Sequence, residues 1–214
     1  MNAMKTNAEV FIIESLNFED EQKNRFEGKI LSDILALSRK RCLHFYIRTV
    51  RELRSVLQRF TESNYRYLHL SCHGNHESMS TTLDTISFAE FANIVGPHLK
   101  QRRLFVSACS MANNNLASVV MPSTGCYSLL GPAQDIYFGD AAILWASLYH
   151  VMFTHDSSAM TGSILRTKAQ GVADMYQLRL NYFGRDTSKK RGYIAKKITP
   201  PLAGTKKVTT KKSS

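Results

Sequence analysis

The stretch Leu104–Ser110 reads Leu-Phe-Val-Ser-Ala-Cys-Ser and is the clearest buried strand in the sequence. Its apolar run follows two arginines and stops at small residues, which predicts a strand that ends at the edge of a sheet. Cys109 would lie where that strand ends. In open α/β sheets, ligands bind in the crevice outside the carboxyl ends of the strands, so Cys109 is a candidate functional residue.

A second stretch, Tyr67–Gly74, has the same pattern: Tyr-Leu-His-Leu-Ser-Cys-His-Gly, an apolar run followed by a histidine and a glycine. His73 and Cys109 are 36 positions apart, which leaves room for the helical crossover that joins parallel strands. As parallel neighbours, the two strands would bring both side chains to one sheet edge. An imidazole there can lower the pKa of a thiol and later donate a proton to a leaving group. The amides of Gly74 and Cys109 are candidate donors to an oxyanion.

Expected strands and helices alternate along the body of the chain. This order predicts an α/β fold with a mostly parallel sheet covered by helices on both faces. The 214 residues suffice for one such domain with a sizeable core. The polar segment 75–85 is expected to be a loop. The expected strands are 8–14, 41–49, 65–73, 102–109 and 125–130, and the expected helices are 18–40, 50–60, 87–95, 113–121, 140–153 and 158–182.

The positive charge of the chain is concentrated near its C-terminus. The net charge is +11, and the segment 185–214 alone carries +9, which leaves a nearly neutral body. This segment also contains prolines and a Thr/Ser-rich end. We therefore expect residues 1–184 to form the folded domain, and residues 185–214 to form a disordered basic tail that can be removed without unfolding. Such a tail could attract an acidic partner such as a nucleic acid, but a solvated terminus is the simpler interpretation.

The cysteines and the lack of long apolar segments favour the cytoplasm. No C-x-x-C pair occurs, and each of the four cysteines lies in or beside an apolar run, as reduced thiols usually do. No stretch approaches the eighteen apolar residues of a membrane span, and residues 1–10 lack an apolar region long enough for export. We expect a cytoplasmic protein with no membrane partner.

Taken together, the two stretches resemble the caspase-like CHAT peptidases, in which one apolar strand ends in Cys-His-Gly and a later strand ends in Ser-Ala-Cys. In this chain these motifs are Cys72–Gly74 and Ser107–Cys109, in the same order. The likeness extends over residues 8–153. The wider clan contains caspases, gingipains and separase, which are cysteine endopeptidases built on a three-layer α/β/α sandwich with a His–Cys dyad.

The resemblance implies a cysteine endopeptidase that acts on protein or peptide substrates without a cofactor. His73 then becomes the general acid/base, and Cys109 becomes the nucleophile that forms a thioester. Related peptidases bind basic side chains with an acid located after the strand at 125–130, which makes Asp135 the candidate for a basic residue before the scissile bond (P1). Ser110 stands where acids are common in the family, and the caspase sequence Gln-Ala-Cys-Arg-Gly is absent, so aspartate specificity is not expected. Family members are often controlled by partner proteins, so a separate regulator is a further expectation.

The sequence leaves other interpretations open. A lone cysteine at a strand end is more often a packing residue, and the chain could be a catalytically inactive caspase-like interaction module. It could instead be an α/β protein that binds nucleic acid through its basic tail. The cluster of His69, Cys72, His73 and His76 contains residue types that bind zinc. Adjacent residues of a strand point to opposite faces, and His69 is expected in the core, so no metal is predicted.

Overall fold

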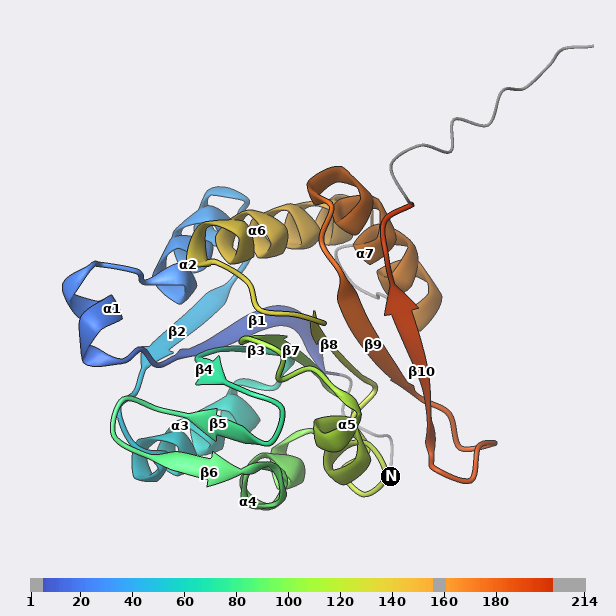
Figure 1. The fold of residues 1–214 in the computed structure, drawn as a ribbon, viewed down its shortest axis with the longest axis horizontal. Coiled ribbons are helices and arrows are strands. Elements are labelled where there is room, and N and C mark those ends of the chain that lie inside the picture. The colour runs from blue at the N-terminus through green and yellow to red at the C-terminus, as the bar shows by residue number, and fades with distance from the viewer. Residues whose placement is uncertain (1–5, 156–160, 202–214) are drawn as a thin grey trace, which may run out of the picture.

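A seven-stranded sheet with the order β10-β9-β8-β7-β3-β1-β2 forms the centre of the molecule (Figure 1). The computed structural model describes residues 6–155 and 161–201. Neighbouring strands from β2 to β8 are parallel, and β9 and β10 each run antiparallel to the strands beside them. The strands of this sheet are β1 (Asn7–Glu14), β2 (Cys42–Tyr46), β3 (Tyr65–Ser71), β7 (Arg103–Ser107), β8 (Ser128–Pro132), β9 (Leu180–Arg185) and β10 (Tyr193–Ile198).

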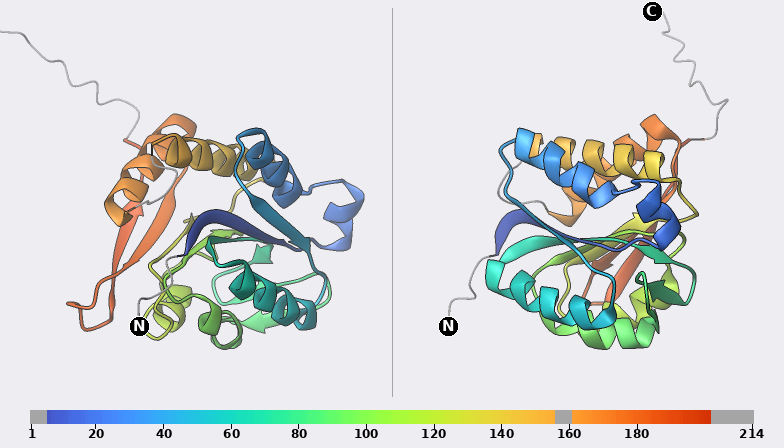
Figure 2. Two further views of the ribbon diagram at one scale, coloured as in Figure 1. Left: turned by 180° about the vertical axis from the view of Figure 1, so that it is seen from behind. Right: turned by 90° about the vertical axis from the view of Figure 1, so that its left-hand side faces the viewer.

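Helices cover both faces of the sheet (Figure 2). The expected three-layer α/β/α sandwich with a mostly parallel central sheet is therefore confirmed. One layer consists of α2 (Glu27–Leu37), α6 (Phe138–His155) and α7 (Gly162–Tyr176), and the other consists of α3 (Val50–Ser63), α4 (Phe88–Val95) and α5 (Asn114–Val120). The short α1 (Phe18–Gln22) precedes α2, and the 3₁₀ turn η1 (Gly96–His98) follows α4.

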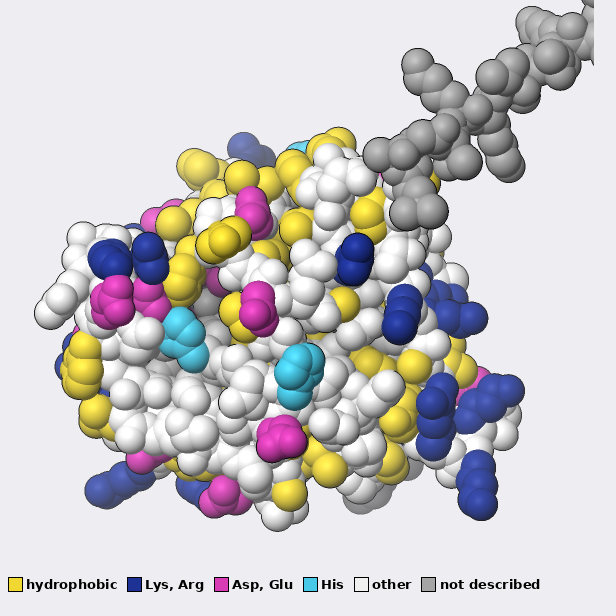
Figure 3. All heavy atoms as spheres, in the orientation of Figure 1, with side chains coloured by type: hydrophobic (Ala, Val, Ile, Leu, Met, Phe, Trp, Pro, Cys, Tyr) yellow, Lys and Arg dark blue, Asp and Glu magenta, His cyan; other side chains and the backbone are white. Residues whose placement is uncertain are grey.

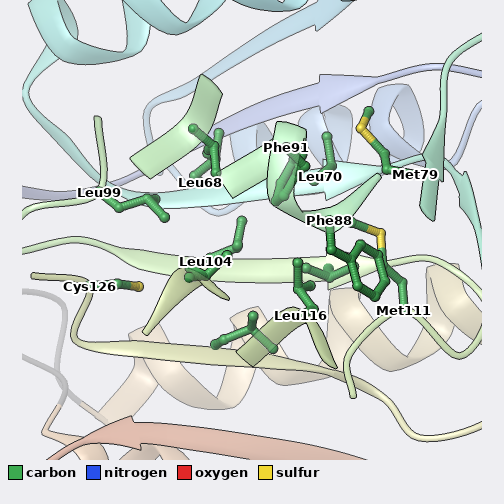
Figure 4. Close-up of a cluster of buried hydrophobic side chains, with 14 of the residues drawn as sticks. Leu68, Leu70, Met79, Phe88, Phe91, Leu99, Leu104, Met111, Leu116 and Cys126 are labelled. Carbon is green, nitrogen blue, oxygen red and sulfur yellow. The ribbon is translucent and has the colours of Figure 1, made fainter. Parts of the chain in front are cut away.

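Successive side chains of β7 point to opposite faces of the sheet and enter two separate hydrophobic clusters. Leu104 and Val106 belong to the cluster beneath α3, α4 and α5, whereas Phe105 belongs to the cluster beneath α2, α6 and α7. Because both faces of this strand are buried, its three central residues, 104–106, are all apolar. Figure 4 shows the first cluster, in which leucines of β3 and β7 meet apolar side chains of α4 and α5.

The expected helix 18–40 is interrupted and forms α1 and α2. Asn17 caps α1, since its side-chain oxygen accepts from the Asp20 amide at 2.8 Å. Asn24 then adopts a left-handed backbone (φ 53°), which few residues other than glycine and asparagine tolerate, and the first helix ends there. The interruption separates Asp20 from α2 and leaves it free to reach the end of a neighbouring strand.

Residues 75–85, expected to be a loop, contribute instead to a small antiparallel sheet of β4 (His73–Gly74), β5 (Ser78–Ser80) and β6 (Thr85–Ser87). Two of its strands bury one apolar side chain each, Met79 in β5 and Ile86 in β6. A single apolar residue between polar neighbours gives no detectable period, and the expectation failed for that reason.

The C-terminal region also differs from the expectation. The helix expected at 158–182 ends at Tyr176, because Gln177 takes a left-handed backbone (φ 54°), and the chain then returns as β9. The boundary expected after residue 184 falls inside β9, and residues as far as Ile198 belong to the sheet rather than to a disordered tail. Two buried side chains, Tyr193 and Ile198, explain this difference, since they outweigh the surrounding charge. Residues 202–214 lie outside the described part of the chain.

Candidate active site

His73 and Cys109 follow the ends of two adjacent strands at equivalent positions. Strands β3 and β7 are parallel neighbours whose last paired residues are Ser71 and Ser107, and the Cys72 amide donates to the Ser107 carbonyl at 3.2 Å. His73 lies two residues beyond the last pair on one strand, and Cys109 lies two residues beyond it on the other. The register of the sheet therefore directs both residues to the same edge.

The imidazole of His73 is held by a buried carboxylate that sequence reasoning missed. Its Nε2 lies 2.8 Å from Oδ2 of Asp20, a residue of α1 that is only 4% exposed. The other oxygen of Asp20 accepts from the Arg25 guanidinium at 2.7 Å, and the His73 ring meets Phe138 edge to face at 6.0 Å. In the sequence, Asp20 is one of several acids at the start of a helix, and the residue it contacts is 53 positions away.

Cys109 faces a cavity of about 630 Å³ beyond the strand ends. The side chain is half-buried, and its Sγ lies 3.8 Å from the Ile136 carbonyl, to which the thiol can donate. The Cys109 amide finds no backbone acceptor among the described residues, so its N–H is available to a ligand. Figure 3 shows this face of the molecule, where histidine side chains reach the surface beside acidic and basic ones.

Gly74 lies in a closely packed position beside Cys109. A β-carbon at residue 74 would come within 3.1 Å of the Ser78 carbonyl oxygen and 3.2 Å of Met111 Sδ. A side chain at this position would therefore crowd Ser78 and Met111 beside the cavity that Gly74 and Cys109 both line. The glycine thus keeps a main-chain segment close to the thiol, as a site with backbone donors needs.

Asp135 lines the same cavity as Cys109 and is exposed. Its Oδ1 accepts from Ser110 Oγ at 2.9 Å. Ser110 itself has a left-handed backbone (φ 52°), a conformation that costs about 1–3 kcal/mol in a residue with a side chain. The residue after the candidate nucleophile is therefore strained, and its hydroxyl connects the end of β7 to the loop that carries Asp135.

A buried network lies directly beneath the two strand ends. Glu27, the first residue of α2, is 3% exposed, and its Oε2 accepts from Ser71 Oγ at 3.0 Å and from Ser107 Oγ at 2.8 Å. His69 is fully buried beside it, with Nδ1 2.9 Å from the hydroxyl of Tyr149 and Nε2 3.6 Å from Glu27 Oε1. One carboxylate thus joins β3 and β7 two residues before His73 and Cys109. The expectation of a core position for His69 is confirmed.

The remaining cysteines are poor nucleophiles. Burial raises the pKa of Cys72 far above its usual range, with smaller contributions from Glu27 and Cys109. Burial also raises the pKa of Cys126 and of Cys42 to about 11. None of these three thiols lines the cavity of Cys109. Within residues 6–155 and 161–201, no group of three His, Cys, Asp or Glu side chains is arranged to hold a metal ion, and no helix there is long and apolar enough to cross a membrane.

The chain was compared with known proteins by sequence and by structure. No protein-family model and no curated protein sequence matches it. Solved structures do match: a secreted C11 cysteine protease from Bacteroides thetaiotaomicron has a TM-score of 0.51 at 10% identity, and the Arg-specific cysteine proteinase gingipain R has 0.53 at 10%. Caspase-1 from Spodoptera frugiperda has a TM-score of 0.50 at 13% identity. The fold is caspase-like.

The extent of these matches varies. The caspase alignment covers 92% of this chain and 89% of the other, and the C11 protease alignment covers 85% and 67%. The gingipain alignment covers 80% of this chain but only 43% of that protein. At such identities the likeness concerns the fold alone. What this chain can do chemically depends on how its sheet places His73, Cys109 and Asp20.

Proposed function

We propose that the protein is a cysteine endopeptidase with Cys109 as nucleophile and His73 as general acid/base. The observation that carries this proposal is the placement of a cavity-lining thiol and a carboxylate-held imidazole past the ends of adjacent parallel strands. A positioned nucleophile, a base and a group that orients the base form the arrangement that acyl transfer requires. The caspase-like fold agrees with this assignment, and the substrate would be a protein or peptide.

The proposed reaction needs no cofactor. The Cys109 proton moves to His73, and the thiolate attacks the carbonyl carbon of the scissile bond. The oxyanion that forms accepts hydrogen bonds from the amides of Gly74 and Cys109. His73 then gives its proton to the leaving nitrogen, and the C–N bond breaks to leave a thioester. Water, deprotonated by His73, attacks the thioester, releases the carboxylic acid and restores the thiol.

Asp20 serves in this scheme as a positioning residue. Its carboxylate accepts from Nε2 of His73, which fixes the tautomer and leaves Nδ1 as the nitrogen that exchanges a proton with Cys109. Arg25 contacts the other oxygen of Asp20 at 2.7 Å and so helps to hold the carboxylate in place. When His73 gains a proton, the buried negative charge beside it stabilises the imidazolium.

We further propose that the cavity accepts a basic P1 side chain, with arginine favoured over lysine. Asp135 supports this preference, because its carboxylate shares the cavity with the nucleophile and is oriented by Ser110. The planar guanidinium of an arginine can pair with a carboxylate through two parallel hydrogen bonds. Arg25 lines the same cavity, but it is already paired with Asp20 and lies over the Phe138 ring at 5.5 Å.

Hydrolysis of fluorogenic peptides that vary only at P1 tests the chemistry and the specificity together. Cys109→Ala and His73→Ala should each abolish cleavage and leave the circular dichroism spectrum unchanged, since both residues lie outside the packed middle of the sheet. Cys72→Ala is the matched control, which should stay active. An inactive, well-folded Cys72→Ala variant would show that Cys72, rather than Cys109, is the nucleophile. Unchanged cleavage by Cys109→Ala would contradict the proposal.

The specificity is tested separately by Asp135→Asn. This change should lower kcat/KM for arginine and lysine substrates by at least tenfold more than for leucine substrates, because the bound cation loses its charged partner. Selection for leucine or methionine at P1, with no response to Asp135→Asn, would exclude Asp135 from the site and leave Cys109 and His73 in their roles.

A further inference from the structure

The outer side of β10 presents main-chain groups that are not used in the sheet. β10 is the last strand of the sheet, and its hairpin turn projects beyond the neighbouring strands (Figure 1). The Arg185 amide donates to the Tyr127 carbonyl at 3.0 Å, so the odd-numbered residues of β9 bond to β8 and the even-numbered ones bond to β10. Tyr193, Ala195 and Lys197 lie opposite odd-numbered residues of β9. Their N–H and C=O groups therefore point outward.

Most of these outward groups have no partner among the residues that the structure describes. The Tyr193 carbonyl accepts from Arg191 Nε at 2.9 Å. The Tyr193 amide and both main-chain groups of Ala195 and Lys197 make no hydrogen bond within those residues. Donors and acceptors in such a row have the spacing that an added strand needs.

Five cations border this edge. Segment 187–201 contains no acid, and its basic residues are all exposed: Lys189, Lys190, Arg191, Lys196 and Lys197. In the described part of the chain, no carboxylate lies within ion-pair distance of any of them. Asp186 precedes the segment, and its Oδ1 accepts from the Ser188 amide at 3.0 Å and from the Ser188 hydroxyl at 2.6 Å. Figure 3 shows basic side chains gathered over this hairpin.

Lys196 and Lys197 flank the edge from opposite faces of the sheet. Tyr193 belongs to the cluster beneath α3, α4 and α5, whereas Ile198 belongs to the cluster beneath α2, α6 and α7. Because side chains alternate along a strand, Lys197 lies on the face of Tyr193 and Lys196 on the face of Ile198. A strand added here would therefore meet one ammonium group on each of its faces.

The turn fixes the other three cations at the start of the same edge. The Asp186 amide donates to the Gly192 carbonyl at 2.9 Å, and the Gly192 amide donates to the Lys189 carbonyl at 2.8 Å. Gly192 has a φ of 76°, which glycine adopts without strain. The Arg191 guanidinium lies 4.8 Å over the Tyr193 ring. Charge is thus held in place beside the unpaired main-chain groups.

We propose that the β10 edge binds an extended acidic segment of a partner protein, which adds to the sheet as a further strand. Main-chain hydrogen bonds would hold the segment, and the cations would select Asp and Glu side chains in it. A nucleic acid matches the charge but cannot form the ladder, and Tyr193, the aromatic residue of β10, is buried and offers no ring to a base. No residue of β10 lines the Cys109 cavity, so this binding is independent of the proposed peptidase activity.

Fluorescence anisotropy of the full chain with a labelled peptide of Val-Glu-Glu-Thr repeats tests the charge. The wild type should bind this peptide, and replacing its Glu residues with Gln should abolish binding. Lys196→Gln/Lys197→Gln should raise the Kd about fivefold at low salt, since two exposed ion pairs are lost. Arg51→Gln/Arg54→Gln removes the same charge from exposed positions of α3 and should leave the Kd within about twofold.

Two changes test the main-chain pairing without altering the charge. A peptide of the same sequence with N-methylated main-chain amides should not bind. Ala195→Pro removes an outward N–H, keeps the bonds to β9 and should also prevent binding, with the Tm of the variant showing that it is folded. Hydrogen–deuterium exchange in segment 193–198 should slow when the unmodified peptide is present, which locates the contact in the wild type as well.

The proposal is overturned if the wild type does not bind the peptide, or if both glutamine variants weaken binding equally. Equal binding of the N-methylated peptide would show that charge alone acts and that no strand is added. Tighter binding of a duplex oligonucleotide than of the peptide, unaffected by Ala195→Pro, would identify a nucleic-acid surface instead.

Discussion

A single buried carboxylate, that of Asp20, contacts both the His73 ring and the Arg25 guanidinium. Replacing it with asparagine keeps the shape of the side chain but removes the charge that stabilises an imidazolium. We expect Asp20→Asn to lower kcat by at least tenfold with little change in KM, since the contact matters most when His73 is protonated. Steady-state kinetics on the best peptide from the P1 series would measure both constants.

The control for this prediction is the neighbouring acid Glu19. It is exposed and pairs with Lys23, the residue that follows α1, so Glu19→Gln should leave kcat and KM unchanged. An Asp20→Asn variant with wild-type kcat would show that the His73 ring is oriented by its other surroundings, such as the edge contact with Phe138.

The four thiols should differ sharply in reactivity, because only the thiolate is alkylated. The pKa values of Cys42 and Cys126 are raised to about 11. At pH 8, roughly one in a thousand of such thiols is ionised. Cys72 is disfavoured further by complete burial. We expect iodoacetamide to modify Cys109 first and the others only near pH 11 or after unfolding. Peptide mapping by mass spectrometry would detect this order, and early labelling of Cys42 would contradict it.

At the scale of elements, α2 is joined to β3 and β7 through the carboxylate of Glu27. Ser107→Ala removes one of the two hydroxyls that donate to it. The lost hydrogen bond is made to a charged group, so the free energy of unfolding should fall by about 1.5–3 kcal/mol. Denaturant titration would measure the loss, and kcat should fall as well because the β7 end carries Cys109. Ser55→Ala, on the exposed side of α3, is the control that should change neither quantity.

The β9–β10 hairpin gives a second prediction at this scale. A chain ending at Gly184 loses β10, and with it the buried side chains of Tyr193 and Ile198. Burying each of these is worth roughly 1.5–3 kcal/mol, a large part of the stability of an ordinary domain. We expect this truncation to lose cooperative thermal unfolding. A chain ending at residue 201 keeps the whole sheet and should retain a Tm near that of the full chain. If the two truncated chains had the same Tm, burial of Tyr193 and Ile198 would not account for the stability of this region.

At the scale of the whole molecule, the parallel part of the sheet could be predicted because its strands are long apolar runs. The strands β3 and β7 were located from sequence to within two residues at either end. The antiparallel additions were missed for a physical reason. β10 buries its two end residues, Tyr193 and Ile198, and exposes two adjacent lysines between them, so its sequence looks like a charged linker unless the adjoining strand is already known.

The candidate site was predictable to the extent that it lies on those strands. His73, Gly74 and Cys109 follow strand ends, and Asp135 lies in the loop after β8. The order of the strands and the register between them therefore suffice to place these residues. Asp20 and Glu27 act across the fold on residues at least 44 positions away, and nothing in their local sequence marks them. Groups that orient others through long-range contacts become visible only once the chain is folded.

The exposed border of β10 has a consequence for contacts between molecules. β10 is an outermost strand, and an unpaired strand edge is a template to which another chain can add. Lys196 and Lys197 are adjacent and exposed on this strand. If two copies paired through their β10 edges in opposite directions, four lysine ammonium groups would lie close together. Their repulsion would oppose edge-to-edge extension of the sheet and the aggregation that would follow.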